Sequence, residues 1–172
     1  MHPSAFFQHN MQNKSDVSPL INQKPIMLKG HCKRRGETIE LAFMLKAASL
    51  GFGVAKPWGE SDRYDVILDS GHRLWRVQVR STESEVRRRF RVGATVTGGA
   101  VLSPADIDVL AAYIIPLDIW YLVPVGHLGS RVDIRLYPYG SAEFGHFEIF
   151  REAWHLFDSP PCINFSEPEN LP

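Results

Sequence analysis

The sequence predicts an α/β domain in which helices pack on a mixed β-sheet. Helix-like and strand-like segments follow in the order helix, three strands, helix, strand, and then a further strand and helix. Residues 74–81 alternate with the period of a strand, and aromatic residues near the end recur every three or four positions. The 172 residues suit one domain, and 44% apolar and 22% charged residues exclude a wholly disordered chain, a fibrous repeat and a disulfide scaffold.

The first half of the domain is expected to hold one helix and three strands. Residues 37–50 (ETIELAFMLKAASL) are good helix formers, and Gly51 stands in the position of a C-cap. A short strand over 53–57 ends at a proline. Residues 64–69 and 74–81 are predicted to be strands joined by a Ser-Gly-His turn, so that they form a hairpin.

The second half is expected to add strands and two helices. Residues 87–92 are predicted to form a strand, and a Ser-Pro pair at the start of 103–114 predicts a helix there. Residues 119–125 (IWYLVPV) predict an apolar strand at the centre of the sheet, and 132–137 predict another. The aromatic residues within 147–157 predict a last amphipathic helix that covers the core.

The two ends differ from this core. Residues 1–27 are polar and predict a disordered N-terminal extension, in which Met27 is an alternative start, and 158–172 predict a Pro-rich C-terminal tail. Residues 28–157 form the expected domain. The longest apolar run, 109–117, is about half of the roughly 20 residues that span a membrane, and no secretory signal is visible. We therefore expect a cytoplasmic protein with free thiols and no membrane contact.

The formal net charge is zero, but the charge is unevenly distributed. Residues 28–102 hold 14 Lys and Arg against 8 Asp and Glu, whereas residues 103–172 hold 3 against 10. Such asymmetry indicates either a basic binding face backed by an acidic half or chance clustering.

Several polar side chains are expected to meet at one end of the predicted hairpin. Asp65 begins one strand, while Gln78 and Arg80 lie two residues apart on the other and leave the same face. Glu40 on the first helix can reach this end from the side. The two carboxylates, the Gln78 amide oxygen and the Val79 carbonyl are oxygen ligands that suit Mg²⁺. A metal there could activate water and hold a phosphodiester, with Arg80 facing the developing negative charge.

Four short motifs follow one another along the first half of the domain. They are Gly36-x-x-x-Glu40, Gly51-x-x-Val54-x-x-Pro57, Tyr64-Asp65-x-x-x-Asp69 and Val77-Gln78-Val79-Arg80. In order and spacing they resemble the PD-(D/E)XK nuclease superfamily. They are most similar to the branch related to a cyanobacterial group I intron homing endonuclease, in which glutamine replaces the acidic residue of the third motif. The resemblance spans about residues 28–157.

The resemblance implies a restriction-endonuclease-like αβββαβ core, with a mixed central sheet flanked by helices. It also implies an endonuclease that hydrolyses DNA phosphodiester bonds with Mg²⁺ or Mn²⁺. Glu40, Asp65 and Gln78 would match three site positions of the family, with Glu40, Asp65 and the Val79 carbonyl holding metal. Arg80 stands where the family has lysine, and arginine cannot serve as a base. The sequence therefore leaves open whether the chain cleaves DNA or is a catalytically impaired module that binds DNA or protein.

Two basic runs are candidate contacts to double-stranded DNA. They are Lys33, Arg34 and Arg35 near the first helix, and Arg87, Arg88, Arg89 and Arg91 after the hairpin. A solvated edge strand that resists aggregation would carry a similar run. A homo-oligomer is also compatible with the resemblance, because nuclease domains often pair to cut both strands.

Each candidate site residue also has a purely structural explanation. Glu40 could be a solvated helix residue, and Asp65 could bond a turn amide. Arg80 could pair with either carboxylate as a structural ion pair. A domain of that kind would show no metal-linked stabilisation and no salt-dependent DNA affinity.

Overall fold

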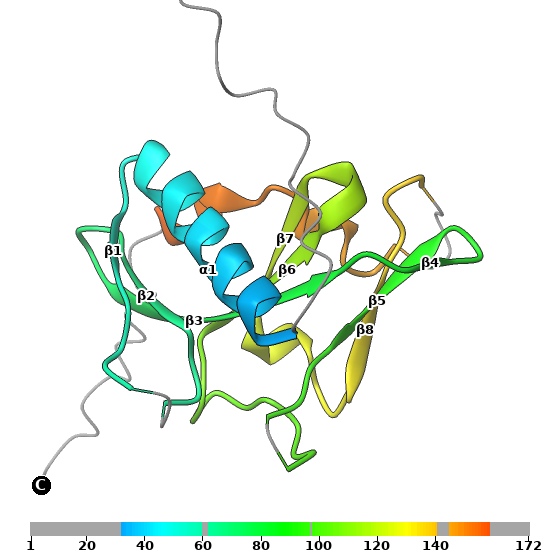
Figure 1. Cartoon of the computed structure of the whole chain (residues 1–172), viewed down its shortest axis with the longest axis horizontal. Helices are drawn as coiled ribbons and strands as arrows, with labels where there is room; N and C mark the ends of the chain where they lie inside the picture. Colours follow the sequence, from blue (N-terminus) through cyan, green and yellow to red (C-terminus); the bar gives the residue numbers. More distant parts are fainter. Residues whose placement is uncertain (1–31, 60–61, 97, 141–144, 159–172) are drawn as a thin grey trace, which may run out of the picture.

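The computed structural model describes residues 32–59, 62–96, 98–140 and 145–158, so the expected extension and nearly all of the expected tail lie outside the described residues. A helix, a five-stranded sheet and a three-stranded sheet form three layers (Figure 1). The helix is α1 (Cys32–Ser49). The larger sheet holds β1 (Gly53–Ala55), β2 (Val66–Asp69), β3 (Leu74–Thr82), β6 (Val109–Ile114) and β7 (Ile119–Pro124). The smaller sheet holds β4 (Glu85–Val86), β5 (Arg89–Gly93) and β8 (Asp133–Leu136).

β3 lies at the centre of the larger sheet, whose order is β1–β2–β3–β6–β7. β1, β2 and β3 are antiparallel neighbours, β6 runs parallel to β3, and β7 runs antiparallel to β6. The sheet is therefore mixed, and the expected restriction-endonuclease-like α/β fold is confirmed. The expectation that 119–125 forms a central strand is wrong, because β7 is an edge strand. Its apolar run reflects burial on both faces, since Trp120 is buried on the face that α1 covers and Tyr121 on the opposite face.

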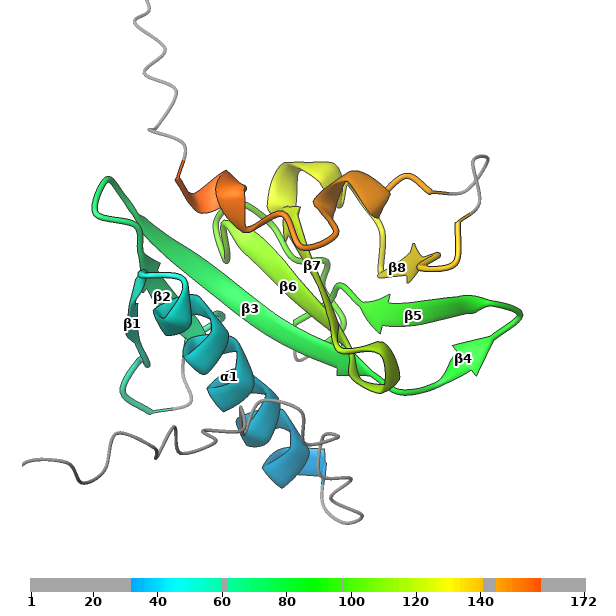
Figure 2. The ribbon, with the colours of Figure 1, turned by 90° about the horizontal axis from the view of Figure 1, so that it is seen from above.

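α1 covers one face of the larger sheet (Figure 2). Ile39, Phe43 and Ala47, spaced by about one turn, are buried against apolar side chains of β2, β3 and β6. The helix begins at Cys32, earlier than expected, and ends before Gly51, whose φ of 96° suits the expected C-cap. Within the described ranges, no helix is both long and apolar enough to cross a membrane.

The helix expected over 103–114 is not formed. Instead, Ser103 begins a turn in which its backbone N–H and hydroxyl donate to Asp106 Oδ2, at 3.0 and 2.6 Å, and β6 follows. All six residues of β6 are buried, because both faces of the strand are covered. A strand buried on both faces loses its alternation, so its apolar pattern does not differ from that of a buried helix.

The smaller sheet covers the face of the larger sheet that lies opposite α1 (Figure 2). Of the helices expected to flank the sheet, α1 is the one α-helix in the described ranges. β4 and β5 form a hairpin, and β5 and β8 confirm the strands expected over 87–92 and 132–137. Side chains of the two sheets interlock in one apolar cluster, which includes Phe90, Val92, Leu110, Ala112, Tyr121, Val123, Ile134 and Leu136.

Two short 3₁₀ helices, η3 (Glu148–Phe150) and η4 (Trp154–Phe157), replace the single helix expected over 147–157. Glu152 lies between them with a φ of 47°. Its backbone N–H donates to the Trp120 carbonyl at 2.8 Å, and its Oε1 accepts from the Trp120 N–H at 2.7 Å. These bonds tie the segment to the edge of β7 and interrupt the helix.

Asp108 ties the start of β3 to the turn before β6. Its Oδ2 accepts from the backbone N–H of Arg76 at 2.8 Å, and its Oδ1 accepts from Arg73 Nη2 at 2.8 Å. The Arg76 guanidinium also donates to the carbonyls of Pro104 and Ala105. Burial alone would raise the pKa of Asp108, but the bonds from Arg76 and the positive charges of Arg76 and Arg73 hold the pKa below its ordinary value.

Asp108→Ala is expected to lower the free energy of unfolding at pH 7 by about 1–3 kcal/mol, because it leaves the Arg76 N–H without its acceptor. Since folding lowers the pKa of Asp108, this stabilisation is complete above about pH 4 and is lost as the pH falls through the folded pKa. Urea unfolding measures both effects. Asp133→Ala breaks a pair with the mostly exposed Arg91 and should cost less than about 1 kcal/mol. Equal losses in the two variants would contradict this assignment.

Candidate active site

Asp65 is held by two hydrogen bonds from β3. It directly precedes β2, and its backbone N–H donates to the Val77 carbonyl at 2.9 Å. Its Oδ2 accepts from the backbone N–H of Val79 at 2.7 Å and from Gln78 Nε2. The structure therefore brings Asp65 and Gln78 together, as the hairpin pattern predicts. The direction of the carboxylate is set by one backbone N–H of β3 and by the buried side-chain amide of Gln78.

Gln78 is the one polar side chain in the described part of the chain that is buried, with 4% of its surface exposed. A buried amide needs partners, and an ionised carboxylate can only accept hydrogen bonds, so the amide nitrogen must face Asp65. In this arrangement Gln78 orients the carboxylate. That differs from the expectation that its amide oxygen acts as a ligand.

Arg80 lies beside this pair without a close contact to it. Its Nη1 is 3.9 Å from Asp65 Oδ2 and donates a long hydrogen bond of 3.3 Å to the Val79 carbonyl. The Arg80 side chain is 38% exposed. A half-exposed pair at this distance contributes little to stability. The guanidinium is therefore available to a negatively charged group that approaches Asp65 from solvent.

Glu40 is paired with Lys56, which the sequence analysis did not single out. Lys56 Nζ lies 2.5 Å from Glu40 Oε2, and the side chains are 47% and 18% exposed. Ala55 at the end of β1 is opposite Ile67 in β2, so Lys56 follows β1 at the end of the hairpin where Asp65 precedes β2. The antiparallel register of β1 and β2 is the signal that could have identified Lys56.

Glu40, Lys56, Asp65 and Arg80 form a four-charge cluster with two negative and two positive groups. Burial raises the pKa of Asp65, the hydrogen bond from Val79 lowers it, and the negative charge of Glu40 raises it again. Arg80 and Lys56 act in the lowering direction, but the net pKa of Asp65 stays above its ordinary value. The hydrogen bond with Glu40 raises the pKa of Lys56. Two cations of the protein thus face the two carboxylates, but at Asp65 they do not offset burial and the charge of Glu40.

The oxygens of this cluster fit a divalent cation. They are the carboxylates of Asp65 and Glu40 and the backbone carbonyl of Val79, and among the described residues Asp65 Oδ1 accepts no hydrogen bond. Groups of three or more His, Cys, Asp or Glu arranged around a metal position do not occur in the described ranges. Two carboxylates with a neutral oxygen are a donor set that suits Mg²⁺, which keeps several of its waters.

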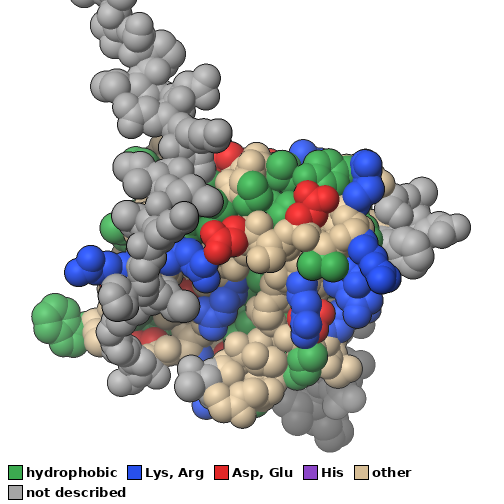
Figure 3. Space-filling model, turned by 45° about the vertical axis from the view of Figure 1, so that its right-hand side comes forward, with side chains coloured by type: hydrophobic (Ala, Val, Ile, Leu, Met, Phe, Trp, Pro, Cys, Tyr) green, Lys and Arg blue, Asp and Glu red, His purple; other side chains and the backbone are tan. Residues whose placement is uncertain are grey.

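The basic residues expected to bind DNA do not form one patch. Arg34 and Arg35 lie in the first turns of α1, where Arg35 pairs with Glu83 at 2.9 Å, and the side chain of Lys33 lies outside the described residues. Arg91 pairs with Asp133 at 2.7 Å. The other three are Arg87, Arg88 and the half-buried Arg89, at and beside the turn of the β4–β5 hairpin. Figure 3 shows Lys and Arg side chains at several places on one face, with acidic side chains among them.

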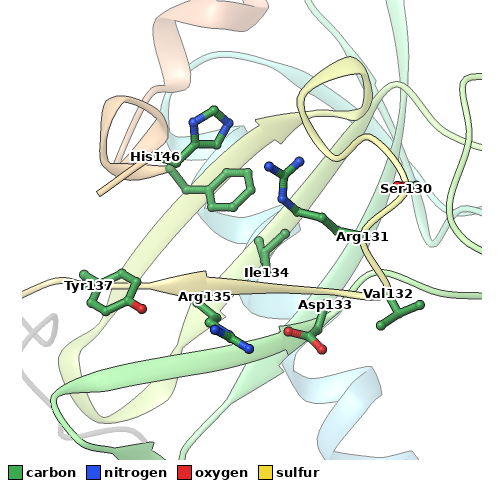
Figure 4. Close-up of a pocket in the computed structure, with 9 residues that line it drawn as sticks. Ser130, Arg131, Val132, Asp133, Ile134, Arg135, Tyr137 and His146 are labelled. Atoms are coloured by element: carbon green, nitrogen blue, oxygen red, sulfur yellow. The ribbon is translucent and has the colours of Figure 1, made fainter. Parts of the chain in front are cut away.

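A pocket of about 470 Å³ lies along β8 and shares no residue with the four-charge cluster. Arg131, Arg135 and His146 contribute to its lining, and Figure 4 shows Arg131 and Arg135 on different sides of the strand. This pocket is therefore separate from the candidate site, which lies at the end of the β2–β3 hairpin where Asp65 precedes β2, with Glu40 of α1 beside it.

Comparison with known proteins gives a family for this arrangement. A model of the PD-(D/E)XK endonuclease family matches residues 30–157, which include Glu40, Asp65, Gln78 and Arg80. The chain belongs to the PD-(D/E)XK endonuclease family. The expectation of an endonuclease is thereby confirmed, and nucleases of this family generally use divalent metals.

A solved structure supports the same assignment. The PD-(D/E)XK chain is similar to the bacterial homing endonuclease I-Ssp6803I, with a TM-score of 0.65 and 30% sequence identity. The match covers 76% of this chain and 93% of that one. None of the curated proteins compared matches the chain.

The opposite pKa shifts of Asp65 and Asp106 predict opposite pH effects on stability. Folding raises the pKa of Asp65, so the native chain loses stability as this carboxyl ionises. Asp65→Asn has no such group. The Tm of Asp65→Asn should therefore rise relative to the Tm of the native chain as the pH increases from about 4 to 7. Hydrogen bonds from Ser103 lower the pKa of Asp106, so Asp106→Asn should lose relative to the native chain over the same range. Thermal unfolding in chelator measures both differences. Shifts of the same sign would show that the Asp65 environment is wrongly assigned.

Proposed function

We propose that the chain is a divalent-metal-dependent endonuclease that hydrolyses phosphodiester bonds in double-stranded DNA. The observation that carries this proposal is the Asp65 carboxylate, fixed by two hydrogen bonds from β3 next to the carboxylate of Glu40. Two negative groups in one electrostatic environment favour a bound cation. The similarity to the homing endonuclease named above supports DNA as the substrate.

Each residue of the cluster has a distinct role in this proposal. Glu40, Asp65 and the Val79 carbonyl would hold Mg²⁺ or Mn²⁺, which would supply Lewis-acid chemistry there. Gln78 orients Asp65 and acts as a positioning residue. Arg80 faces the phosphate and stabilises the negative charge that develops in the transition state.

Lys56 supplies the ammonium group that the third motif lacks. Arg80 occupies the position where the family has lysine, and its wide, permanently charged fork is not equivalent to a compact ammonium. Lys56 reaches the same cluster from the end of β1 and holds Glu40 at 2.5 Å. With a cation held by Glu40, the Lys56 ammonium would be free to contact the phosphate. This supports cleavage by the native chain despite the arginine at position 80.

Cleavage of supercoiled plasmid tests the proposed function. The native chain should nick the plasmid with Mg²⁺ or Mn²⁺ and not with chelator, and Asp65→Ala should abolish nicking because it removes a metal ligand. Gln78→Ala should slow cleavage by about 10–100-fold without abolishing it, since it only frees the ligand from its orienting bond.

The rival proposal, an impaired module that binds DNA or protein, gives a different result in the same assay. It requires that native chain and Asp65→Ala be equally inactive with every metal, or that Arg80→Lys raise cleavage many-fold. We expect Arg80→Lys to leave the rate unimproved, because Lys56 already provides the ammonium.

Lys56→Met is expected to change metal binding and cleavage in opposite directions. The variant removes the exposed Lys56–Glu40 ion pair, which is worth at most about 1 kcal/mol and competes with metal for Glu40. The Mg²⁺ concentration needed for a given rise in Tm should therefore fall by up to about fivefold. Cleavage at saturating Mg²⁺ should fall at least about tenfold, because a cation near the phosphate is removed. Lys46→Met, at an exposed lysine of α1 outside the four-charge cluster, should change neither. Unaltered cleavage in Lys56→Met would remove Lys56 from the mechanism.

The turn of the β4–β5 hairpin is the best-supported DNA contact among the basic residues. Arg87 and Arg88 have φ values of 52° and 61°, the pattern of a type I′ turn, which favours Asn-Gly. Left-handed arginines cost about 1–2 kcal/mol each. Arg87 forms no ion pair with the described residues, and Arg88 lies 5.2 Å over the Tyr139 ring. We infer that both arginines contact DNA phosphates, which would explain their presence at a strained position.

Replacing these residues by Arg87→Asn and Arg88→Gly together keeps the turn and removes the charges. The Tm should stay the same or rise, because the new residues suit positive φ. The slope of log affinity for DNA against log salt should fall by about 0.9 for each phosphate that the protein no longer neutralises. An unchanged slope in this double variant would show that the hairpin does not touch DNA.

A further inference from the structure

Trp58 is the most exposed large apolar side chain of the described residues, with 99% of its surface in solvent. The other three tryptophans are packed in the protein. Trp120 and Trp154 are buried, and Trp75 lies 5.5 Å edge-on to the Phe157 ring. Trp58 forms no ring contact with any described residue. An isolated aromatic surface of this size is what a stacking partner would cover.

The position of Trp58 is tied to the candidate site. It lies two residues after Lys56, whose Nζ contacts Glu40, and two residues of chain span at most about 7 Å. Pro57 restricts the backbone before it, and Gly59 follows with a φ of 87°. The backbone of Trp58 therefore lies close to that of Lys56, a member of the four-charge cluster, with the φ of the intervening Pro57 fixed by its ring.

The chemistry around Trp58 favours a nucleic acid over a protein partner. Lys56 and Arg63, described residues of the same β1–β2 connection, are both about half exposed, Lys56 pairing with Glu40 and Arg63 with Asp106 at 3.3 Å. Trp58 is the only exposed large apolar side chain in the described parts of this connection, 56–59 and 62–65. Protein interfaces bury contiguous apolar patches with few charges at their centre. An exposed aromatic ring with exposed cations on the same connection is typical of surfaces that stack bases and contact phosphates.

We propose that Trp58 inserts between neighbouring bases of the bound duplex and unstacks them beside the phosphate that is cleaved. This inference rests on the proposed function, since it requires DNA at the four-charge cluster. Apolar wedges of this kind kink the duplex. Pyrimidine–purine steps unstack most easily, so the chain should cleave best next to such steps. Trp58 would thereby contribute to the choice of cleavage position without reading base edges.

Binding of a fluorescein-labelled, mixed-sequence 30-bp duplex tests this role in the full chain. All variants carry Asp65→Asn, which prevents cleavage, and the Asp65→Asn chain is the parent for comparison. Binding in Mg²⁺ is followed by fluorescein anisotropy and by tryptophan emission. Trp58→Ala should weaken binding by about 10-fold, because a base can no longer stack on an aromatic ring. Trp58→Phe should retain most of the affinity. The salt slope should not change, since every phosphate contact is kept.

Two further readouts separate a wedge from a passive surface contact. Binding of DNA should quench the tryptophan emission of the parent. In a duplex with 2-aminopurine at a pyrimidine–purine step, unstacking should increase the 2-aminopurine fluorescence when the parent binds but not when Trp58→Ala binds. Ile149→Ala removes an apolar side chain that is 72% exposed on η3 and serves as the control, with no change in affinity.

Several outcomes would overturn the inference. Equal affinity of Trp58→Ala and its parent, or a 2-aminopurine signal that does not rise, would exclude the wedge. A change in oligomeric state with unaltered DNA affinity would assign Trp58 to a protein contact instead. In each case metal-dependent plasmid cleavage by the native chain would leave the proposed function intact. Loss of both plasmid cleavage and DNA binding in the native chain would overturn the function and the inference together.

Discussion

The hydrogen bonds from β3 to the Asp65 carboxylate are the interaction on which the candidate site depends. Gln78 Nε2 and the Val79 N–H both donate to one oxygen, so the carboxylate is oriented by the pairing of two strands at the centre of the domain. Its other oxygen remains available. Burial and the charge of Glu40 oppose ionisation of this group, and the fold therefore has to supply positive charge nearby.

That positive charge comes from two separate elements. Arg80 follows Gln78 on β3, while Lys56 reaches Glu40 from the end of β1. The PD-(D/E)XK pattern places a single lysine on the strand, and in our proposal its functions are divided between Arg80 and Lys56. A wide guanidinium suits a phosphate that approaches from solvent, and a compact ammonium can exchange between Glu40 and the substrate. The site is thus assembled from α1 and the three strands β1, β2 and β3.

The sequence predicted this half of the protein well, because the relevant signals are local. Helix formers with Gly51 behind them define α1, and the alternation in 74–81 places Gln78 next to Asp65. The second half was harder to predict. The segment 103–114 carries a helix start signal, but the buried strand β6 has no alternation that would reveal it. Lys56 was missed because its role depends on strand register rather than on a local motif.

Anomalous scattering from crystals soaked with Mn²⁺ would test the central claim most directly. We expect one peak bonded to the carboxylates of Asp65 and Glu40 and to the Val79 carbonyl, with Lys56 Nζ no longer within hydrogen-bonding distance of Glu40. A peak elsewhere on the molecule, or an ordered site in which Lys56 still holds Glu40 and no metal is bound, would contradict the assignment of this cluster as a metal-binding active site.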